Sequence, residues 1–317
     1  GNIGRPMLAG GEEAADGWVM ELSSYQISDL VAKPDLVVLL NVSDGLLDWH
    51  RGFEQYIADK LRLVELANEG RIIANYSDKL LRENLKHHPR TVWFNKPGNW
   101  QAKKAEVVRQ IERSTDQRAA GHPQLINDQD KVIAPDSLPG AHSMQNLAAA
   151  LTVIDALDVD IPRLDEALSS FTGLSHRLQH LGQKNGVSYI NDSISTTPVS
   201  VTAAIRTTGY KGLVLLLGGM DRGLDWSEFA RNLSKQTPFA IITLPDNGRK
   251  IFNCLRDAGV TPQGGMHTVA DLKEAVCLAK SLVPEKGCIL LSPGAPSFPH
   301  FRNYEDRGEQ FTRYWGF

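Results

Sequence analysis

Short apolar runs alternate along this chain with longer segments in which apolar residues recur every three or four positions. The clearest run, residues 36–40, reads Leu-Val-Val-Leu-Leu. A run that is apolar at every position is typical of a strand buried on both faces, as in a parallel sheet covered by helices. The alternation therefore predicts an α/β fold built from strand–helix–strand units.

The pattern divides into two sets of elements. In the first set we predict strands at 18–22, 35–41, 71–75 and 91–94 and helices at 53–69, 143–157 and 163–171. In the second set we predict strands at 187–191, 213–217, 239–244 and 288–291 and helices at 198–207, 226–235, 249–258, 270–282 and 303–315. Between 95 and 138 the periodicity fades, and no element is predicted there.

A turn-like sequence, Thr172-Gly173-Leu174-Ser175, separates the two sets. We place a domain boundary at Gly173, which gives domains of residues 1–173 and 174–317. A chain of 317 residues is long enough for two domains of roughly 100–200 residues each. Both are predicted to contain parallel or mixed sheets.

Composition narrows the functional classes. A net charge of −3 argues against a dedicated nucleic-acid binder, which usually carries a basic stripe. The sequence has no run of about 18 apolar residues, the length needed to span a membrane. Three cysteines, without a Cys-x-x-Cys pair or zinc-site spacing, fit buried thiols in the reducing cytoplasm. The GxxxxGK[ST], GxGxxG and GxSxG motifs are absent.

Three predicted strands end in segments rich in hydroxyl groups or glycine. Strand 288–291 leads into Ser292-Pro293-Gly294-Ala295-Pro296-Ser297, strand 187–191 into the segment that ends at Thr196-Thr197-Pro198, and strand 213–217 into Gly218-Gly219-Met220-Asp221-Arg222-Gly223. Ligands in open α/β sheets lie beyond the carboxyl ends of the strands, and backbone N–H groups in such turns can bind anions. The alternative is a set of ordinary turns with helix caps and solvated charges.

The predicted helix 53–69 carries Lys60 one turn after Tyr56, on or beside its apolar stripe. One interpretation is a lysine whose stem packs against apolar neighbours while its ammonium group reaches water. The other is a functional lysine in a site that alters its charge. The pattern alone does not separate the two.

Several strings, in the same order along the chain, resemble motifs of Mur ligases of the D type, which add glutamate to UDP-N-acetylmuramoyl-alanine. They are ELSSYQ (21–26), LDWH with Tyr56 and Lys60, GAHSMQN (140–146), the His176-Arg177 pair, NDSISTTP (191–198), GGMDRG (218–223) and SPGAPSFPHFRNYEDRG (292–308). The resemblance spans nearly the whole chain. It implies a partial P-loop-type central ATPase domain over 1–173, truncated at its N-terminus, and a Rossmann-like glutamate- and ATP-binding domain over 174–317.

For the first domain the resemblance implies a magnesium and nucleotide site. Glu21 would bind Mg²⁺, and Lys60, carbamylated in the family, would be a catalytic residue that supports a second ion. A histidine ligand of the relatives is replaced by Leu46, which cannot coordinate Mg²⁺. Either another donor such as His50 replaces it, or the second ion binds poorly. The nucleotide-sugar substrate is assigned to Asn2, Ser23 and Gln26, and the adenine nucleotide to Asn146.

For the second domain the resemblance implies phosphate and amino-acid binding. The catalytic Arg177 would contact the γ-phosphate of ATP, and Asp192 the ATP ribose. The incoming amino acid is assigned to Thr196, Arg222, Ser297 and Tyr304. Arg222 stands where the family has a lysine, which changes the geometry of the contact as well as the donor number.

The expected activity is ATP-dependent amide formation through an acyl phosphate in peptidoglycan precursor synthesis, by a monomer in the cytoplasm that binds only small molecules. Ile194 replaces a family lysine, and NDSISTTP with SPGAPS resembles the branch that adds L-glutamate rather than D-glutamate. Two alternatives remain: a non-catalytic glutamate- or nucleotide-binding module, and a ligase like folylpolyglutamate synthetase. Because the family's UDP-binding domain and phosphate loop should precede Gly1, we expect these 317 residues alone to lack ligase activity.

Overall fold

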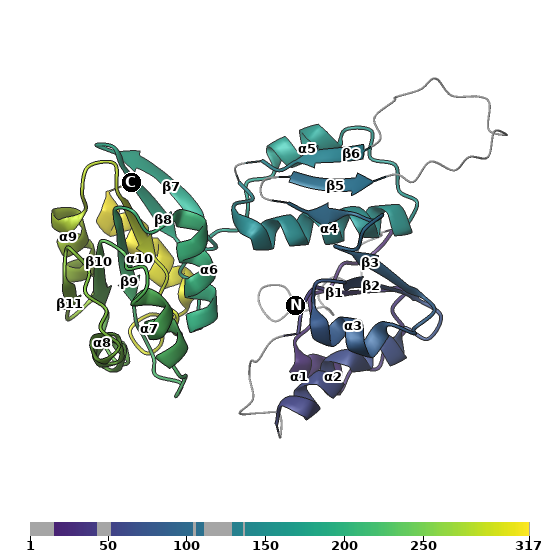
Figure 1. Ribbon diagram of the computed structural model, residues 1–317, viewed down its shortest axis with the longest axis horizontal. Helices are drawn as coiled ribbons and strands as arrows, with labels where there is room; N and C mark the ends of the chain where they lie inside the picture. Colours follow the sequence, from purple (N-terminus) through teal and green to yellow (C-terminus); the bar gives the residue numbers. More distant parts are fainter. Residues whose placement is uncertain (1–15, 43–51, 104–105, 111–128, 136, 317) are drawn as a thin grey trace. The chain divides into compact units, whose positions relative to one another are not determined.

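The computed structural model describes residues 16–42, 52–103, 106–110, 129–135 and 137–316 (Figure 1). The chain forms two compact units, one of Gly1–Ala134 with Ala141–Glu166 and one of Pro135–Gly140 with Ala167–Phe317. Both contain strands and helices, so the predicted α/β class is confirmed. The functional boundary at Gly173 stays a prediction.

The first unit contains a three-stranded parallel sheet in the order β1-β2-β3. Its strands are β1 (Leu36–Leu39), β2 (Arg71–Asn75) and β3 (Thr91–Phe94), and the helices before and between them are α1 (Ser24–Ser28), α2 (Phe53–Leu66) and α3 (Lys79–Leu85). The central strand β2 is fully buried at Ile72, Ile73 and Ala74. Ile72 and Ala74 share one core cluster with Tyr56 of α2 and Leu81 of α3. The apolar pattern of these segments thus predicted their burial.

A second, antiparallel sheet in the first unit lies where no element was predicted. It consists of β4 (Gln101–Ala102), β5 (Glu106–Gln110) and β6 (Gln129–Ile133), and it is followed by α4 (Gly140–Ala156). The guanidinium of Arg109 lies 4.7 Å from the centroid of the Trp100 ring, and the Trp100 indole N–H donates to Asp155 of α4 at 2.8 Å. These contacts join the sheet to α4.

Two predictions for the first unit are wrong. Residues 18–22 form no strand, because they have no pairing partner, and Trp18 and Val19 are exposed. Helix α4 begins at Gly140 rather than at the predicted Ser143, which is a buried residue of its first turn. The helix predicted at 163–171 is present as α5 (Leu164–Ser170).

The second unit contains a six-stranded sheet in the order β11-β10-β9-β12-β8-β7. The strands are β7 (Gln179–Lys184), β8 (Val187–Asn191), β9 (Leu213–Leu217), β10 (Ala240–Thr243), β11 (Met266–Thr268) and β12 (Cys288–Leu291). All pairs are parallel except β7–β8. Asn185 and Gly186 connect β7 to β8 and both have positive φ values, 54° and 78°, as a two-residue hairpin turn requires.

Helices cover both faces of this sheet. They are α6 (Pro198–Thr208), α7 (Ser227–Leu233), α8 (Gly248–Asp257), α9 (Leu272–Leu282) and α10 (Tyr304–Trp315). Strand β9 shows the arrangement: Leu213, Leu215 and Leu217 pack with α6, α7 and α8, whereas Val214 and Leu216 pack with α9 and α10. Successive side chains of a strand point to opposite faces, so an all-apolar strand is buried between two helical layers.

The winding of the second unit sets where a ligand can bind. From β8 the chain runs to β9, β10 and β11 with α6, α7 and α8 on one face, and α9 on the other face then leads back to β12 between β9 and β8. Ligand sites of open α/β sheets lie beyond the carboxyl ends of strands where the winding reverses. The loops after β8, β12 and β9 meet at that edge.

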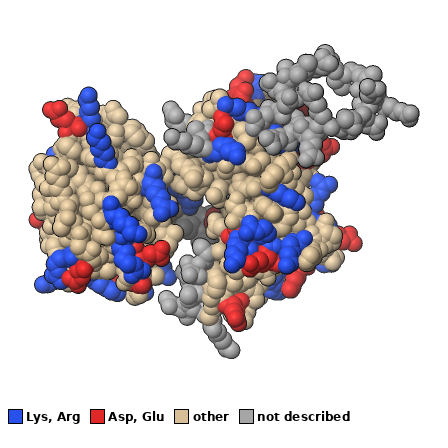
Figure 2. All heavy atoms as spheres, viewed as in Figure 1, with Lys and Arg blue, Asp and Glu red and all other residues tan. Residues whose placement is uncertain are grey.

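Within the described part of the chain, no helix has the length and apolar character needed to cross a membrane. Figure 2 shows Lys and Arg side chains interspersed with Asp and Glu side chains on the face drawn.

The buried strand β9 provides a test of the two-layer core. We expect Leu215→Ala to lower the free energy of unfolding by roughly 2–5 kcal/mol, because the fully buried side chain leaves a cavity. Val199→Ala at an exposed site of α6, 73% accessible, should change it by less than about 0.5 kcal/mol. Urea denaturation followed by circular dichroism measures both, and equal effects would contradict the assignment of Leu215 to the core.

Candidate functional site

The loops after β8, β12 and β9 lie side by side and are joined by backbone hydrogen bonds. The Asp192 N–H donates to Leu291 O at 2.8 Å, and the Gly218 N–H donates to Pro293 O at 2.8 Å. The Met220 N–H donates to Pro296 O at 3.0 Å. Because the first bond joins the loop after β8 to the end of β12 and the other two join the loops after β9 and β12, the edge forms one continuous surface.

Gly219 allows the closest approach between two of these loops. Its φ of 152° is rarely adopted by residues with a side chain, and a Cβ atom there would lie 2.4 Å from Pro296 O. The Asn247 side chain, after β10, accepts from the Gly219 N–H at 3.0 Å, and the Asn247 N–H donates to Gly219 O at 3.0 Å. The loop after β10 is thereby tied to the same surface.

Asp192 is the buried carboxylate of the site. Its Oδ1 accepts from the Leu178 N–H at 3.0 Å, and its Oδ2 accepts from the hydroxyls of Ser292, at 2.7 Å, and of Ser195. Burial raises the pKa of Asp192, and these hydrogen bonds and the charge of Arg177 partly oppose the rise. Both oxygens therefore already have protein donors, and the predicted ribose contact stays a prediction.

Arg307 of α10 is fully buried beneath the loops. Its Nε donates to the Ser193 hydroxyl at 3.0 Å, and its Nη2 donates to the carbonyls of Ser193 and Ala295 at 2.8 and 2.9 Å. Ser193 follows β8 and Ala295 follows β12, so one guanidinium joins two loops. No role was predicted for Arg307 from the sequence, although its position four residues before Phe311 and eight before Trp315 places it on the buried stripe of α10.

The charge of Arg307 has no carboxylate partner among the described residues, and Nη1 has no hydrogen-bond acceptor there. Burial lowers the pKa of the guanidinium to about 9, which leaves it protonated at neutral pH. A buried cation without a counter-ion contributes a positive potential. We infer that this edge of the sheet favours an anionic ligand.

Three predicted amino-acid-binding residues share this edge. Thr196 follows β8, Arg222 follows β9 and Ser297 follows β12, and these strands are neighbours in the sheet. Ser297 is buried and lines a cavity of about 190 Å³, together with Gly218, Gly219, Gln310 and Tyr314 among others. Arg222 is exposed, and neither it nor Thr196 lines this cavity.

Arg177 and Tyr304 lie near Asp192. Arg177 is exposed, and its charge acts to lower the pKa of Asp192 and of Tyr304. For Tyr304 burial and Glu305 prevail, so its pKa is raised. Arg177, a predicted phosphate-binding residue, thus lies near both Asp192 and Tyr304, a predicted amino-acid-binding residue.

In the first unit, Ser23 and Gln26 contact each other. The Ser23 hydroxyl accepts from the Gln26 N–H at 3.3 Å, and the Gln26 side chain accepts from the Ser23 N–H at 3.0 Å, which forms a capping box at the start of α1. Their predicted substrate contacts stay predictions. Asn2 lies outside the described residues.

Lys60 is half-buried on α2, with its Nζ atom 5.3 Å from the centroid of the Tyr56 ring. Burial lowers the pKa of its ammonium group, which increases the fraction of the free amine. Glu21 is exposed before α1. An unmodified lysine repels Mg²⁺, so these two residues fit the ion only if Lys60 carries a carbamate.

The described part of the chain holds no group of three or more His, Cys, Asp or Glu side chains arranged for a metal. Leu46 and His50 lie outside it. The replacement of the family's histidine by another donor therefore stays a prediction.

A polar network that the sequence analysis missed lies beyond β2 and β3. The Asn75 amide donates to Leu40 O at 3.0 Å and to the Gln145 side chain at 3.3 Å, and its oxygen accepts from Asn95 at 3.0 Å. Gln145 precedes Asn146, which is exposed on α4. The Asn-Tyr-Ser-Asp sequence that begins at the last residue of β2 was the available signal.

Two family models match the chain: the Mur ligase middle domain over residues 5–154 and the Mur ligase glutamate ligase domain over residues 176–294. A curated relative from Xanthomonas oryzae pv. oryzae, named UDP-N-acetylmuramoyl-L-alanine–L-glutamate ligase, is 38% identical over all of this chain. The chain spans 66% of the length of that relative.

Two solved structures share the fold. The MurF ligase of Thermotoga maritima in complex with ADP has a TM-score of 0.63 at 16% identity, with 90% of this chain and 62% of that chain covered. The MurC ligase of the same organism has a TM-score of 0.61 at 17% identity, with 92% and 61% covered.

Arg307 can be tested by a conservative change. We expect Arg307→Lys to lower the free energy of unfolding by roughly 2–4 kcal/mol, because a lysine keeps the buried charge but cannot replace donors that point to both loops. The matched control is Arg302→Lys, at a side chain 81% exposed in an ion pair with Asp306, with an expected change below about 0.5 kcal/mol. Urea denaturation compares the two, and an Arg307→Lys effect no larger than the control's would contradict the role of Arg307.

Proposed function

The chain belongs to the Mur ligase family, and from this membership we propose that it supplies the nucleotide- and amino-acid-binding surfaces of an ATP-dependent glutamate ligase. The proposed acceptor is UDP-N-acetylmuramoyl-L-alanine. The observation that carries the proposal is the meeting of the loops after β8, β9 and β12 at one edge, above the buried charge of Arg307.

The proposed reaction has two steps. The substrate carboxylate takes the γ-phosphoryl group of ATP, which leaves ADP, and the amine of glutamate then attacks the acyl carbon and expels phosphate. Phosphoryl transfer depends mainly on positioning and charge stabilisation. Arg177, an exposed guanidinium near Asp192 and Tyr304, is suited to stabilise the negative charge of the transferred group.

Glutamate carries two carboxylates, and the edge offers groups that bind them. Arg222 can donate a bidentate pair of hydrogen bonds, and Thr196 and Ser297 provide hydroxyls from the neighbouring loops. The positive potential from Arg307 favours an anion there. We propose L-glutamate as the amino acid, because NDSISTTP and SPGAPS resemble the L-glutamate branch and the curated relative is named for L-glutamate.

For the first unit we propose that Lys60 carries a carbamate and, with Glu21, holds Mg²⁺. The lowered pKa of Lys60 supports the proposal, because carbon dioxide reacts with a free amine and not with an ammonium group. When bound, the ion supplies charge neutralisation for the ATP phosphates. Asn146 is proposed to contact the adenine nucleotide from α4.

Titration calorimetry of the chain with each glutamate enantiomer tests the amino-acid site. We expect L-glutamate to bind more tightly than D-glutamate. Arg222→Met should weaken binding at least about ten-fold, through the loss of charge-assisted hydrogen bonds. Arg256→Met, at an exposed site near the end of α8, is the control and should bind as the wild type does. Equal affinity for both enantiomers, or none for either, would refute the proposed specificity.

A carbamate on Lys60 can be detected directly. In ¹³C-bicarbonate buffer we expect a carbamate carbonyl resonance that is lost on acidification, since carbamates decompose when protonated. Lys60→Met should abolish the signal, whereas Lys79→Met, at an exposed lysine of α3, should retain it. A signal that persists in Lys60→Met would assign the carbamate to another amine.

A further inference from the structure

His176 is held in an unusual backbone conformation next to Arg177. Its φ is 63° and that of Leu178 is 45°, so Arg177 lies between two non-glycine residues in the left-handed region. This conformation is strained for residues that carry a side chain, and it persists only where the surroundings hold it. The groups that hold His176 and Leu178 in this conformation therefore also fix the backbone of Arg177, which lies between them.

The backbone of this segment is tied on both sides. The His176 N–H donates to the Gln179 side chain at 3.0 Å, and His176 O accepts from the Ile194 N–H at 3.1 Å. The Leu178 N–H donates to Asp192 at 3.0 Å. The two residues that flank Arg177 are thus bound to the loop after β8.

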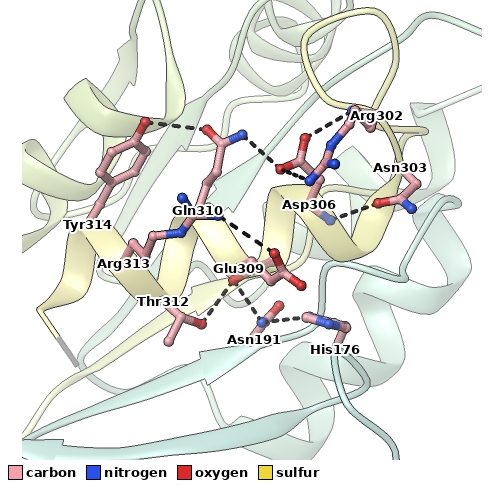
Figure 3. Close-up of polar contacts among 11 residues, drawn as sticks. His176, Asn191, Arg302, Asn303, Asp306, Glu309, Gln310, Thr312, Arg313 and Tyr314 are labelled. Atoms are coloured by element: carbon pink, nitrogen blue, oxygen red, sulfur yellow. Dashed lines mark hydrogen bonds and ion pairs between the residues drawn. The ribbon is translucent and has the colours of Figure 1, made fainter.

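Asn191 and Gly308 lie against the side chain of His176, and the contact of Asn191 with the ring is visible in Figure 3. The Asn191 amide nitrogen lies 3.0 Å from His176 Nδ1 and 3.2 Å from Gly308 O. A Cβ atom on Gly308 would lie 2.2 Å from His176 Nδ1, so only glycine leaves room for the ring. Asn191 is fully buried. Asn191 and Gly308 together enclose the His176 ring, and we call these two residues the clamp.

The hydrogen-bond partners of Asn191 select one tautomer of the His176 ring. The Asn191 oxygen accepts from the Ser193 N–H at 3.1 Å, and Gly308 O can only accept, so the amide orientation is fixed. The NH₂ group therefore faces the imidazole and donates to it. Nδ1 must accept, which requires the neutral tautomer with its proton on Nε2.

We propose that Asn191 and Gly308 are positioning residues that hold His176 in the neutral Nε2–H tautomer and thereby fix the backbone of Arg177. The His176 ring also contacts the Tyr304 ring edge-on, with centroids 6.0 Å apart. The clamp therefore connects the residue proposed for the phosphate with one proposed for the amino acid. Its effect on ligand binding rests on the proposed function, whereas its effect on His176 does not.

The tautomer is tested by ¹⁵N NMR of the 317-residue chain labelled at histidine, with His176→Gln used to assign the signals. We expect an unprotonated Nδ1 and a protonated Nε2. Asn191→Asp has nearly the same shape but replaces the NH₂ donor with an acceptor, so it should place a proton on Nδ1. A protonated Nδ1 in the wild type, or an unchanged Nδ1 in Asn191→Asp, would overturn the proposal.

The backbone effect is tested by hydrogen exchange at the Ile194 amide, whose acceptor is His176 O. Both variants should accelerate this exchange: Asn191→Asp places a carboxylate oxygen against the Gly308 carbonyl oxygen, which repels it, and Gly308→Ala places a Cβ atom against the His176 ring. The control is Thr312→Ala, which removes the hydroxyl that donates to Gly308 O at 2.9 Å and does not touch the ring; it should leave the tautomer and the exchange unchanged. Unchanged exchange in both clamp variants would refute the positioning of this segment.

A double-mutant comparison connects the clamp to Arg177. Asn191→Asp and Gly308→Ala should each weaken binding of Mg-ATP by roughly 10- to 100-fold, and neither should add to the loss caused by Arg177→Ala. Additive losses would show that the clamp does not act through Arg177. A wild-type chain without measurable ATP affinity would count against the proposed function. In that case the tautomer of His176 and the hydrogen exchange at the Ile194 amide would still test whether the clamp positions His176.

Discussion

The organisation of the second unit depends on one buried charge. The guanidinium of Arg307 is removed from water, and its Nε and Nη2 atoms donate to the Ser193 hydroxyl and to the carbonyls of Ser193 and Ala295. These acceptors belong to loops that no strand pairing connects. A buried cation destabilises the fold unless it has hydrogen bonds of good geometry. Each loop can therefore move little before its hydrogen bond to the guanidinium is lost and the buried charge destabilises the fold.

The parallel sheet brings the loops close enough for this contact. Strand β12 lies between β9 and β8, so the segments that follow these strands are neighbours, although Asp192 after β8 and Ser292 after β12 are 100 positions apart in sequence. The close approach at Gly219, the backbone bonds to Pro293 and Pro296, and the Asn247 side chain then complete the surface. Rigid strands thus place the polar groups, and a few side chains fix the loops that carry them.

The sequence predicts those elements whose burial is uniform and misses those whose stability comes from partners distant in sequence. The five apolar residues of β9 identify a strand buried on both faces, and the structure confirms it. Strand β7 reads Gln-His-Leu-Gly-Gln-Lys and lies at the sheet edge, where half-exposed polar residues are tolerated; only the Asn185-Gly186 turn indicated it. Residues 18–22 contain strand-forming residues but lack a partner strand, so propensity alone misled the prediction.

The residues of the candidate site likewise divide into those with a local sequence signal and those without one. Motifs identified the loops, because hydroxyl and glycine residues after apolar strands are a local signal. Arg307 and Asn191 carry no loop signal of this kind: the spacing of Arg307 from Phe311 and Trp315 indicates burial but not which loops it contacts, and an asparagine at a strand end normally caps a turn. Their roles come from burial against residues more than 100 positions away or across the sheet, and single-sequence patterns do not contain that information.

The first turns of α10 combine these constraints. The Asn303 side chain accepts from the Asp306 N–H at 2.8 Å and starts the helix. Tyr304, Arg307 and Gly308 follow at spacings of three and four residues, which places them on one face: the Tyr304 ring meets His176, Arg307 joins the loops, and Gly308 leaves space for the imidazole. The opposite edge carries Asp306, Gln310 and Tyr314, hydrogen-bonded in sequence (Figure 3).

A helix that must present an aromatic ring, a guanidinium and no side chain at three neighbouring positions has little freedom to rotate or slide. The position of this one helix therefore sets both the loop edge and the segment that carries Arg177.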